Sequence, residues 1–155
     1  MTIYLVRHAA AGNRSQWEKP DWLRPLSTRG RAQARGLLHV LHTGRFERIV
    51  SSPYVRCTET VLPLAGAHGL PIELDESLEE GADEHATFAL VKQCLADGAV
   101  LCSHGDMIPM VLEMLAEQGV DLGPRPRCEK GSVWVLDTKS GAVTKAKYIR
   151  PTADD

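Results

Sequence analysis

Three features that the sequence lacks narrow the classes of protein to which it can belong. The 155 residues include four cysteines, none at Cys-x-x-Cys spacing, and the chain is too long for a small disulfide scaffold. No apolar stretch approaches the roughly 20 residues that a membrane-spanning helix needs, and no signal peptide is visible at the start. We therefore expect reduced thiols, a cytoplasmic location and no membrane association.

An excess of charge of either sign is also missing. Eighteen Lys and Arg residues against twenty Asp and Glu residues give a formal net charge of -2. This balance argues against a nucleic-acid binder that works by bulk electrostatics, although a local basic pocket for a phosphate remains compatible with it. The length and composition favour one domain over residues 1–150, a flexible tail at 151–155, and a monomer or weak homodimer.

Strand and helix signals alternate along the chain. Apolar runs predict strands at 3–6, 48–51, 71–74 and 99–103, and a closing hairpin over 131–149. Helices are expected between them, capped by Ser27 or Thr28, by Ser52 before Pro53, by Asp83 and by Asp106, with Pro63 kinking or splitting the second helix. Residues 11–25 are expected to form an ordered loop. The order predicts a three-layer α/β/α sandwich with a mostly parallel central sheet.

Candidate functional residues follow the predicted strands, where ligands bind in sheets of this kind. Arg7 and His8 follow the first strand, Arg56 lies shortly after the second, and His104 follows the fourth. A neutral imidazole can act as a nucleophile, and arginine forks can hold phosphoryl oxygens without a metal. The helix that starts near Gly105 would direct backbone N–H groups at the same anion. The set predicts phosphoryl transfer.

Four segments in order resemble the histidine phosphatase superfamily, which is phosphoglycerate-mutase-like. They are Leu5-Val6-Arg7-His8-Ala9, Leu26 to Ala34, Ser51 to Arg56, and Ser103-His104-Gly105-Asp106. The resemblance implies the phosphoglycerate-mutase-like fold and a phosphohistidine intermediate on His8. It also implies a phosphate pocket made by Arg7, Arg56 and His104.

The resemblance leaves two positions open. The proton donor of the family often lies in a Leu-x-Glu stretch, which points to Glu80, with Glu79 and Asp83 as alternatives. An asparagine often follows the nucleophile, and here either Asn13 or Arg14 would bind substrate.

The alanines after His8 are similar to the small phosphohistidine-phosphatase-like branch and to relatives joined to Nudix domains. We expect a phosphatase that needs no metal or organic cofactor and acts on a small phosphorylated substrate or a phosphohistidine protein. The alternatives are a nucleotide phosphate hydrolase of the same fold, or a non-catalytic module that binds phosphate or a phosphoprotein.

Overall fold

The computed structural model describes residues 1–153, so the last two residues of the expected tail, 154–155, lie outside the described part. The backbone of Thr152 lies against Gly36. The strands are β1 (Thr2–Arg7), β2 (Arg48–Ser51), β3 (Ile72–Leu74), β4 (Ala99–Ser103), β5 (Val133–Lys139) and β6 (Ala142–Ile149). The helices are α1 (Thr28–Leu41), α2 (Val55–His68), α3 (Glu84–Cys94) and α4 (Met107–Glu117), with 3-10 turns η1 (Arg14–Gln16), η2 (Asp21–Leu23) and η3 (Glu76–Leu78).

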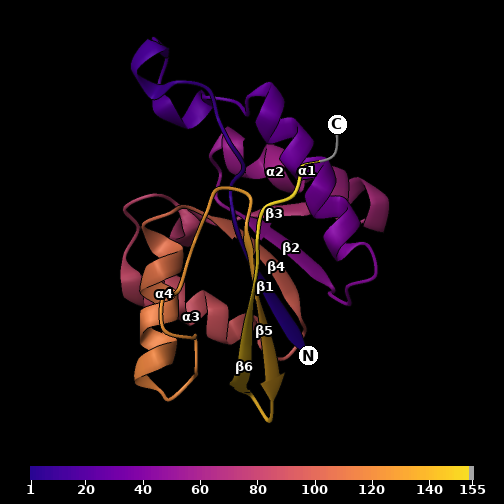
Figure 1. The fold of residues 1–155 in the computed structure, drawn as a ribbon, viewed down its shortest axis with the longest axis vertical. Helices are drawn as coiled ribbons and strands as arrows, with labels where there is room; N and C mark the ends of the chain where they lie inside the picture. Colours follow the sequence, from indigo (N-terminus) through magenta and orange to yellow (C-terminus); the bar gives the residue numbers. More distant parts are fainter. Residues whose placement is uncertain (154–155) are drawn as a thin grey trace.

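The strands form one sheet in the order β3-β2-β4-β1-β5-β6. Strands β3, β2, β4 and β1 are parallel to their neighbours, and the hairpin β5–β6 adds two antiparallel strands at one edge. Helices α1 and α2 cover one face of the sheet, and α3 and α4 cover the other (Figure 1). The predicted three-layer α/β/α sandwich is confirmed.

The sheet separates two hydrophobic clusters because successive side chains of a strand point to opposite faces. Along β1, Ile3 and Leu5 pack toward α3 and α4, whereas Tyr4 and Val6 pack toward α1 and α2. Every residue of β4 is buried, as its continuous apolar run predicts for a central parallel strand.

Two of the expected helix caps are present. The Ser27 side chain accepts from the Gly30 N–H at the start of α1, and the Asp83 side chain accepts from the His85 N–H at the start of α3. Among residues 1–153, no helix combines the length and apolar character that a bilayer-crossing segment requires.

The start and interior of α2 differ from the prediction. The helix begins at Val55 rather than at Pro53, and the Ser52 hydroxyl contacts His104 Nε2 and accepts from the Tyr54 N–H ahead of the helix. It also continues unsplit through Pro63, whose neighbours Val61 and Leu64 are completely buried against the sheet. Packing of the buried face of α2 against the sheet stabilises the helix although Pro63 has no backbone N–H to donate.

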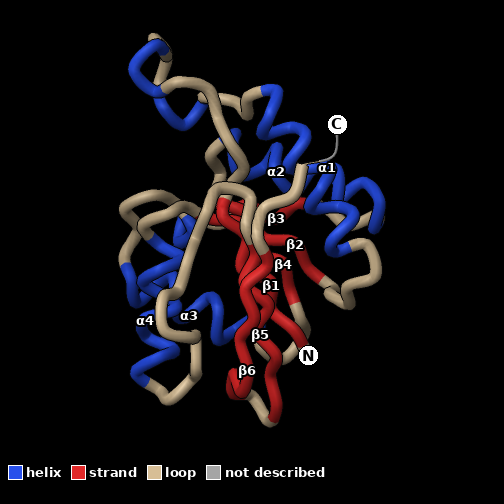
Figure 2. Tube along the Cα trace, viewed as in Figure 1, coloured by secondary structure: helices blue, strands red, loops and turns tan. Residues whose placement is uncertain are grey.

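Loops from distant parts of the sequence meet above the carboxyl ends of the parallel strands. The loop between β1 and α1 extends outward from this end, and the segment between α4 and β5 climbs to it before the chain turns into β5 (Figures 1 and 2). The fold therefore brings residues 8–25, 79–81 and 128–131 to one edge of the sheet.

Candidate active site

A cavity of about 430 Å³ opens at the carboxyl edge of the sheet, next to the end of β1. Most of the residues predicted from the sequence line its wall, including both alternatives for the second substrate contact. The lining residues are Arg7, His8, Ala11, Gly12, Asn13, Arg14, Arg24, Glu80, Gly105, Asp106 and Lys130. Arg56 and His104 lie behind this wall, 0% and 1% exposed.

The imidazole of His8 is held in one tautomer. Its Nδ1 lies 2.8 Å from the carbonyl oxygen of Ala9, which can only accept, so Nδ1 carries the proton and Nε2 has a free electron pair. Burial is the largest cause that lowers the pKa of His8 to about 3, against the opposing effect of the hydrogen bond to Ala9. Electrostatic interactions with His104, Arg56 and Arg7 lower this pKa further. His8 is therefore neutral at physiological pH.

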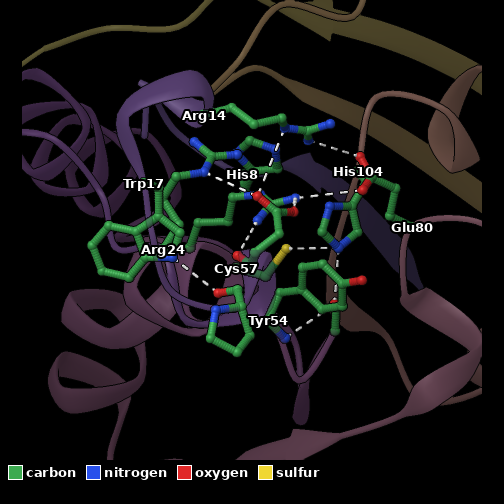
Figure 3. A network of polar contacts seen from close by, with 12 residues as sticks. His8, Arg14, Trp17, Arg24, Tyr54, Cys57, Glu80 and His104 are labelled. Carbon is green, nitrogen blue, oxygen red and sulfur yellow. Dashed lines mark hydrogen bonds and ion pairs between the residues drawn. The ribbon is translucent and has the colours of Figure 1, made fainter. Parts of the chain in front are cut away.

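His104 presents its ring beside that of His8, with the centroids 5.4 Å apart and the planes at 64° (Figure 3). Its Nε2 lies 2.9 Å from Ser52 Oγ, and this oxygen also accepts from the Tyr54 N–H at 3.3 Å. The Ser52 hydroxyl hydrogen can be donated to Nε2, and in that arrangement the ring proton of His104 is on Nδ1. That buried Nδ1 has no hydrogen-bond partner within residues 1–153, so in this tautomer it is a donor ready for an anion.

Arg56 is the largest completely buried side chain of the described residues. Its Nη1 donates to the Asp21 carbonyl oxygen at 3.1 Å. Its Nη2 lies 3.1 Å from Asp21 Oδ2 and 3.7 Å from Glu80 Oε2, while Nε has no partner among residues 1–153. Carboxylate oxygens thus lie at Nη2, while Nε on the same edge stays open to a phosphate oxygen.

Arg7 and Gly105 depend on each other. Arg7 Nη1 donates to the Cys128 carbonyl oxygen at 2.7 Å, and its buried Nε lacks a partner in the described chain. A Cβ at Gly105 would lie 2.5 Å from Arg7 Cζ, so only glycine lets the guanidinium rest on the backbone where α4 approaches. Asp106, expected to cap α4, instead accepts from the Gly81 N–H at 2.8 Å and fixes the acidic loop.

Of the three carboxylates considered as proton donor, Glu80 is the one that lines the cavity. Its Oε1 lies 3.2 Å from Arg14 Nη2, and Figure 3 shows its side chain between Arg14 and His104. Asp83 caps α3 and Glu79 ends η3, so neither lines the cavity. Asn13 and Arg14 were the two alternatives for a further substrate contact. The Asn13 side chain accepts from the Ser15 N–H and caps η1, whereas the Arg14 side chain contacts Glu80.

The sequence reasoning missed a threonine that ties the two sides of the site together. Thr60 Oγ1 accepts from the Ala9 N–H at 2.9 Å and donates to the Arg56 carbonyl oxygen at 2.6 Å. One hydroxyl therefore fixes the peptide after His8 relative to the first turn of α2. Nothing in its helical spacing distinguishes this threonine from an ordinary core residue.

It also missed Asp21, Arg24 and Lys130. Asp21 Oδ1 lies 3.1 Å from Arg24 Nε and 3.7 Å from Arg14 Nε. Burial acts to raise the pKa of Asp21, but the hydrogen bond from Arg24 and the nearby guanidiniums outweigh it and lower that pKa. The Asp21–Arg24 spacing of three residues in a proline-bounded loop is a signal that could have found this pair; Lys130 has none.

No group of three or more His, Cys, Asp or Glu side chains within the described range 1–153 is arranged to hold a metal ion. The site consists of cationic side chains, two imidazoles and three carboxylates, Asp21, Glu80 and Asp106.

Comparison with known proteins decides the family. The sequence model of the histidine phosphatase superfamily (branch 1) matches residues 3–93. The chain belongs to this superfamily. Among histidine phosphatases of known structure, the protein histidine phosphatase SixA complexed with tungstate superposes with a TM-score of 0.74, at 20% identity over 99% of this chain and 97% of that one. This likeness shows a shared fold.

Two curated relatives are longer. An 8-oxo-(d)GTP phosphatase of Mycolicibacterium smegmatis is 32% identical over 157 residues, which cover 97% of this chain and 48% of the relative. The 55 kDa subunit of transcription factor tau from Saccharomyces cerevisiae is 36% identical over 91 residues, covering 51% of this chain and 20% of that protein. The chain thus spans about half the length of the first relative and a fifth of the second.

Proposed function

We propose that this histidine phosphatase hydrolyses phosphomonoesters or phosphohistidine without a metal, through a phosphohistidine intermediate on His8. One observation carries the proposal: a neutral imidazole with a free Nε2 lies beside three buried groups whose donor atoms lack partners within residues 1–153. These donors are Arg7 Nε, Arg56 Nε and His104 Nδ1. Buried donors without acceptors are costly, and a phosphoryl group would satisfy all three.

In the first step, His8 Nε2 attacks phosphorus in line, and an N–P bond forms as the P–O bond to the leaving group breaks. The electron pair of that bond stays on the leaving oxygen. Arg7, Arg56 and His104 hold the equatorial oxygens and stabilise the charge of the transition state. The hydrogen bond from Nδ1 to Ala9 keeps the ring oriented for attack.

Glu80 is the proposed source of the proton for the leaving oxygen. A phosphoryl oxygen that binds Arg56 replaces the Glu80 oxygen that now lies 3.7 Å from Nη2. The carboxylate can then take the proton of a substrate phosphate that binds as the monoanion, turn toward the leaving oxygen and donate that proton to it. In the second step the Glu80 carboxylate takes a proton from water, the water oxygen bonds to phosphorus, and the N–P bond returns its electron pair to His8.

Nucleotide phosphate hydrolysis is the second candidate, favoured by the similarity over nearly the whole chain to a relative that is an 8-oxo-(d)GTP phosphatase. The same first and second steps apply, with a phosphate in place of an alcohol as leaving group.

Steady-state phosphate release with chelator present tests the proposal, with an aryl phosphate, an alkyl phosphate, a phosphohistidine peptide and a nucleoside diphosphate. We expect turnover by the wild type and its loss in His8→Asn, in which the amide keeps a donor for the Ala9 carbonyl. Phosphate binding without turnover of any substrate would instead support a binding module.

A further inference from the structure

The segment between α4 and β5 brings a lysine to the cavity that the proposed mechanism leaves unused. The Gly131 N–H donates to the carbonyl oxygens of Arg7 at 3.1 Å and His8 at 3.0 Å, and the Cys128 carbonyl accepts from Arg7 Nη1 at 2.7 Å. Lys130 lies between Cys128 and Gly131, which these hydrogen bonds hold against the end of β1. Its backbone is therefore fixed beside the Arg7–His8 dipeptide.

The surroundings of the Lys130 ammonium favour the binding of an anion. Lys130 lines the cavity, and within residues 1–153 its ammonium makes no hydrogen bond or ion pair. Burial is the largest cause that lowers the pKa of Lys130, and the charges of Arg7 and Arg24 lower it further. A cation held among other cations becomes favourable when an anion binds between them.

Arg24 adds to the positive charge of the same wall. It is 5% exposed, its Nη1 donates to the Gly12 carbonyl oxygen at 2.6 Å, and its Nε binds Asp21. The oxygens of one transferred phosphoryl group already have donors in Arg7, Arg56 and His104. Lys130 is thus available for a further anionic group of the substrate, and Arg24 adds positive charge to the same wall of the cavity.

We propose that Lys130, supported by Arg24, forms a second anion subsite that binds the phosphoryl group adjacent to the one transferred to His8. The substrate class would then be a phosphoanhydride, such as a nucleoside diphosphate. A tetrahedral phosphate with several acceptor oxygens suits an ammonium beside a guanidinium better than a carboxylate does. This inference rests on the proposed function.

In the corresponding step, the His8 Nε2–phosphorus bond forms as the anhydride P–O bond breaks, and the electron pair stays on the departing phosphate. Lys130 neutralises the charge that develops there. Water then attacks phosphorus, the N–P bond breaks, and inorganic phosphate leaves. Because the departing phosphate is a weak base, this substrate class depends less on a proton from Glu80 than an alkyl phosphate does.

The test compares Lys130→Met, Lys130→Arg and the matched control Lys147→Met, which removes an exposed lysine of β6. For each, kcat/KM is measured with a nucleoside diphosphate and with an aryl monophosphate. We expect Lys130→Met to lower the diphosphate-to-monophosphate ratio about 10- to 100-fold, the effect of losing a charge-assisted contact. Lys130→Arg should restore most of the ratio, and Lys147→Met should keep the wild-type ratio. A ratio that changes less than about threefold in Lys130→Met would overturn the subsite.

Binding measurements separate this inference from the proposed function. Calorimetric titration with inorganic phosphate, inorganic pyrophosphate and a nucleoside diphosphate needs no turnover. Equal losses of pyrophosphate and diphosphate affinity in Lys130→Met, with phosphate affinity retained, would support the subsite even if no substrate were hydrolysed. A loss confined to the nucleoside diphosphate would overturn it, because Lys130 would then contact the nucleoside.

Discussion

Burial of His8 makes folding stability depend on pH in a way that a single substitution can isolate. The pKa of His8 is about 3 in the folded protein, against the ordinary histidine value of 6.5 that applies to an unfolded chain. Below pH 6.5 the unfolded state binds a proton that the folded state does not. The contribution of a neutral His8 to stability is therefore complete above pH 6.5 and is lost progressively as the pH falls toward 3.

The magnitude follows from this difference. Between about pH 7.5 and about pH 5, proton binding to the unfolded state lowers the free energy of unfolding by about 2 kcal/mol through this one group. Because the folded pKa lies well below pH 5, the folded state takes up almost no proton at His8 over this interval. His8→Asn cannot titrate, and its amide can still donate to the Ala9 carbonyl.

Urea denaturation followed by circular dichroism, in buffers free of phosphate, gives the free energy of unfolding at each pH. We expect the wild type to lose about 2 kcal/mol more than His8→Asn over this interval. His42→Asn, which removes an exposed imidazole outside the cavity, is the matched control. Parallel pH dependence of the wild type and His8→Asn would refute the conclusion that burial keeps His8 neutral.

Three further substitutions test the parts around His8. Glu80→Gln should lower kcat about 100- to 1000-fold for an alkyl phosphate, but much less for an aryl phosphate whose leaving group needs no proton. Ser52→Ala removes the hydroxyl that assigns the proton of His104, and kcat/KM should fall about tenfold with the fold retained by circular dichroism. Gly105→Ala places a Cβ 2.5 Å from Arg7 Cζ, and the displaced guanidinium should cost about 100-fold in kcat/KM.

A different outcome would contradict each of these three predictions. Equal effects of Glu80→Gln on alkyl and aryl phosphates would remove Glu80 from the role of proton donor. Wild-type activity in Ser52→Ala would mean that another group sets the His104 tautomer. Wild-type activity in Gly105→Ala would mean that Arg7 reaches phosphate from a different position.

The parts of the site that could be predicted from the sequence are those that the strand ends determine. His8 follows β1 and His104 follows β4, and these strands are parallel neighbours, so their carboxyl ends meet at one edge. Arg56 follows β2, which pairs with β4 on its other side. The mostly parallel sheet that the sequence predicted is therefore enough to expect these three side chains at one edge, and the strand order of the structure makes them neighbours.

The residues that were missed depend on tertiary contacts that no local pattern specifies. A serine before a proline is a good helix cap, yet Ser52 binds His104 because β4 brings that ring within 2.9 Å. Asp21 lies in the short 3-10 turn η2, and its partner Arg56 is 35 residues away along the chain. Lys130 reaches the cavity because Gly131 is fastened to the end of β1.

Intact-protein mass spectrometry after rapid quenching without acid, during turnover of an aryl phosphate, tests the central proposal most directly. We predict a transient gain of one phosphoryl group together with released phenol, with both absent in His8→Asn. Turnover without any adduct, or an adduct that persists in His8→Asn, would contradict the assignment of His8 as the nucleophile.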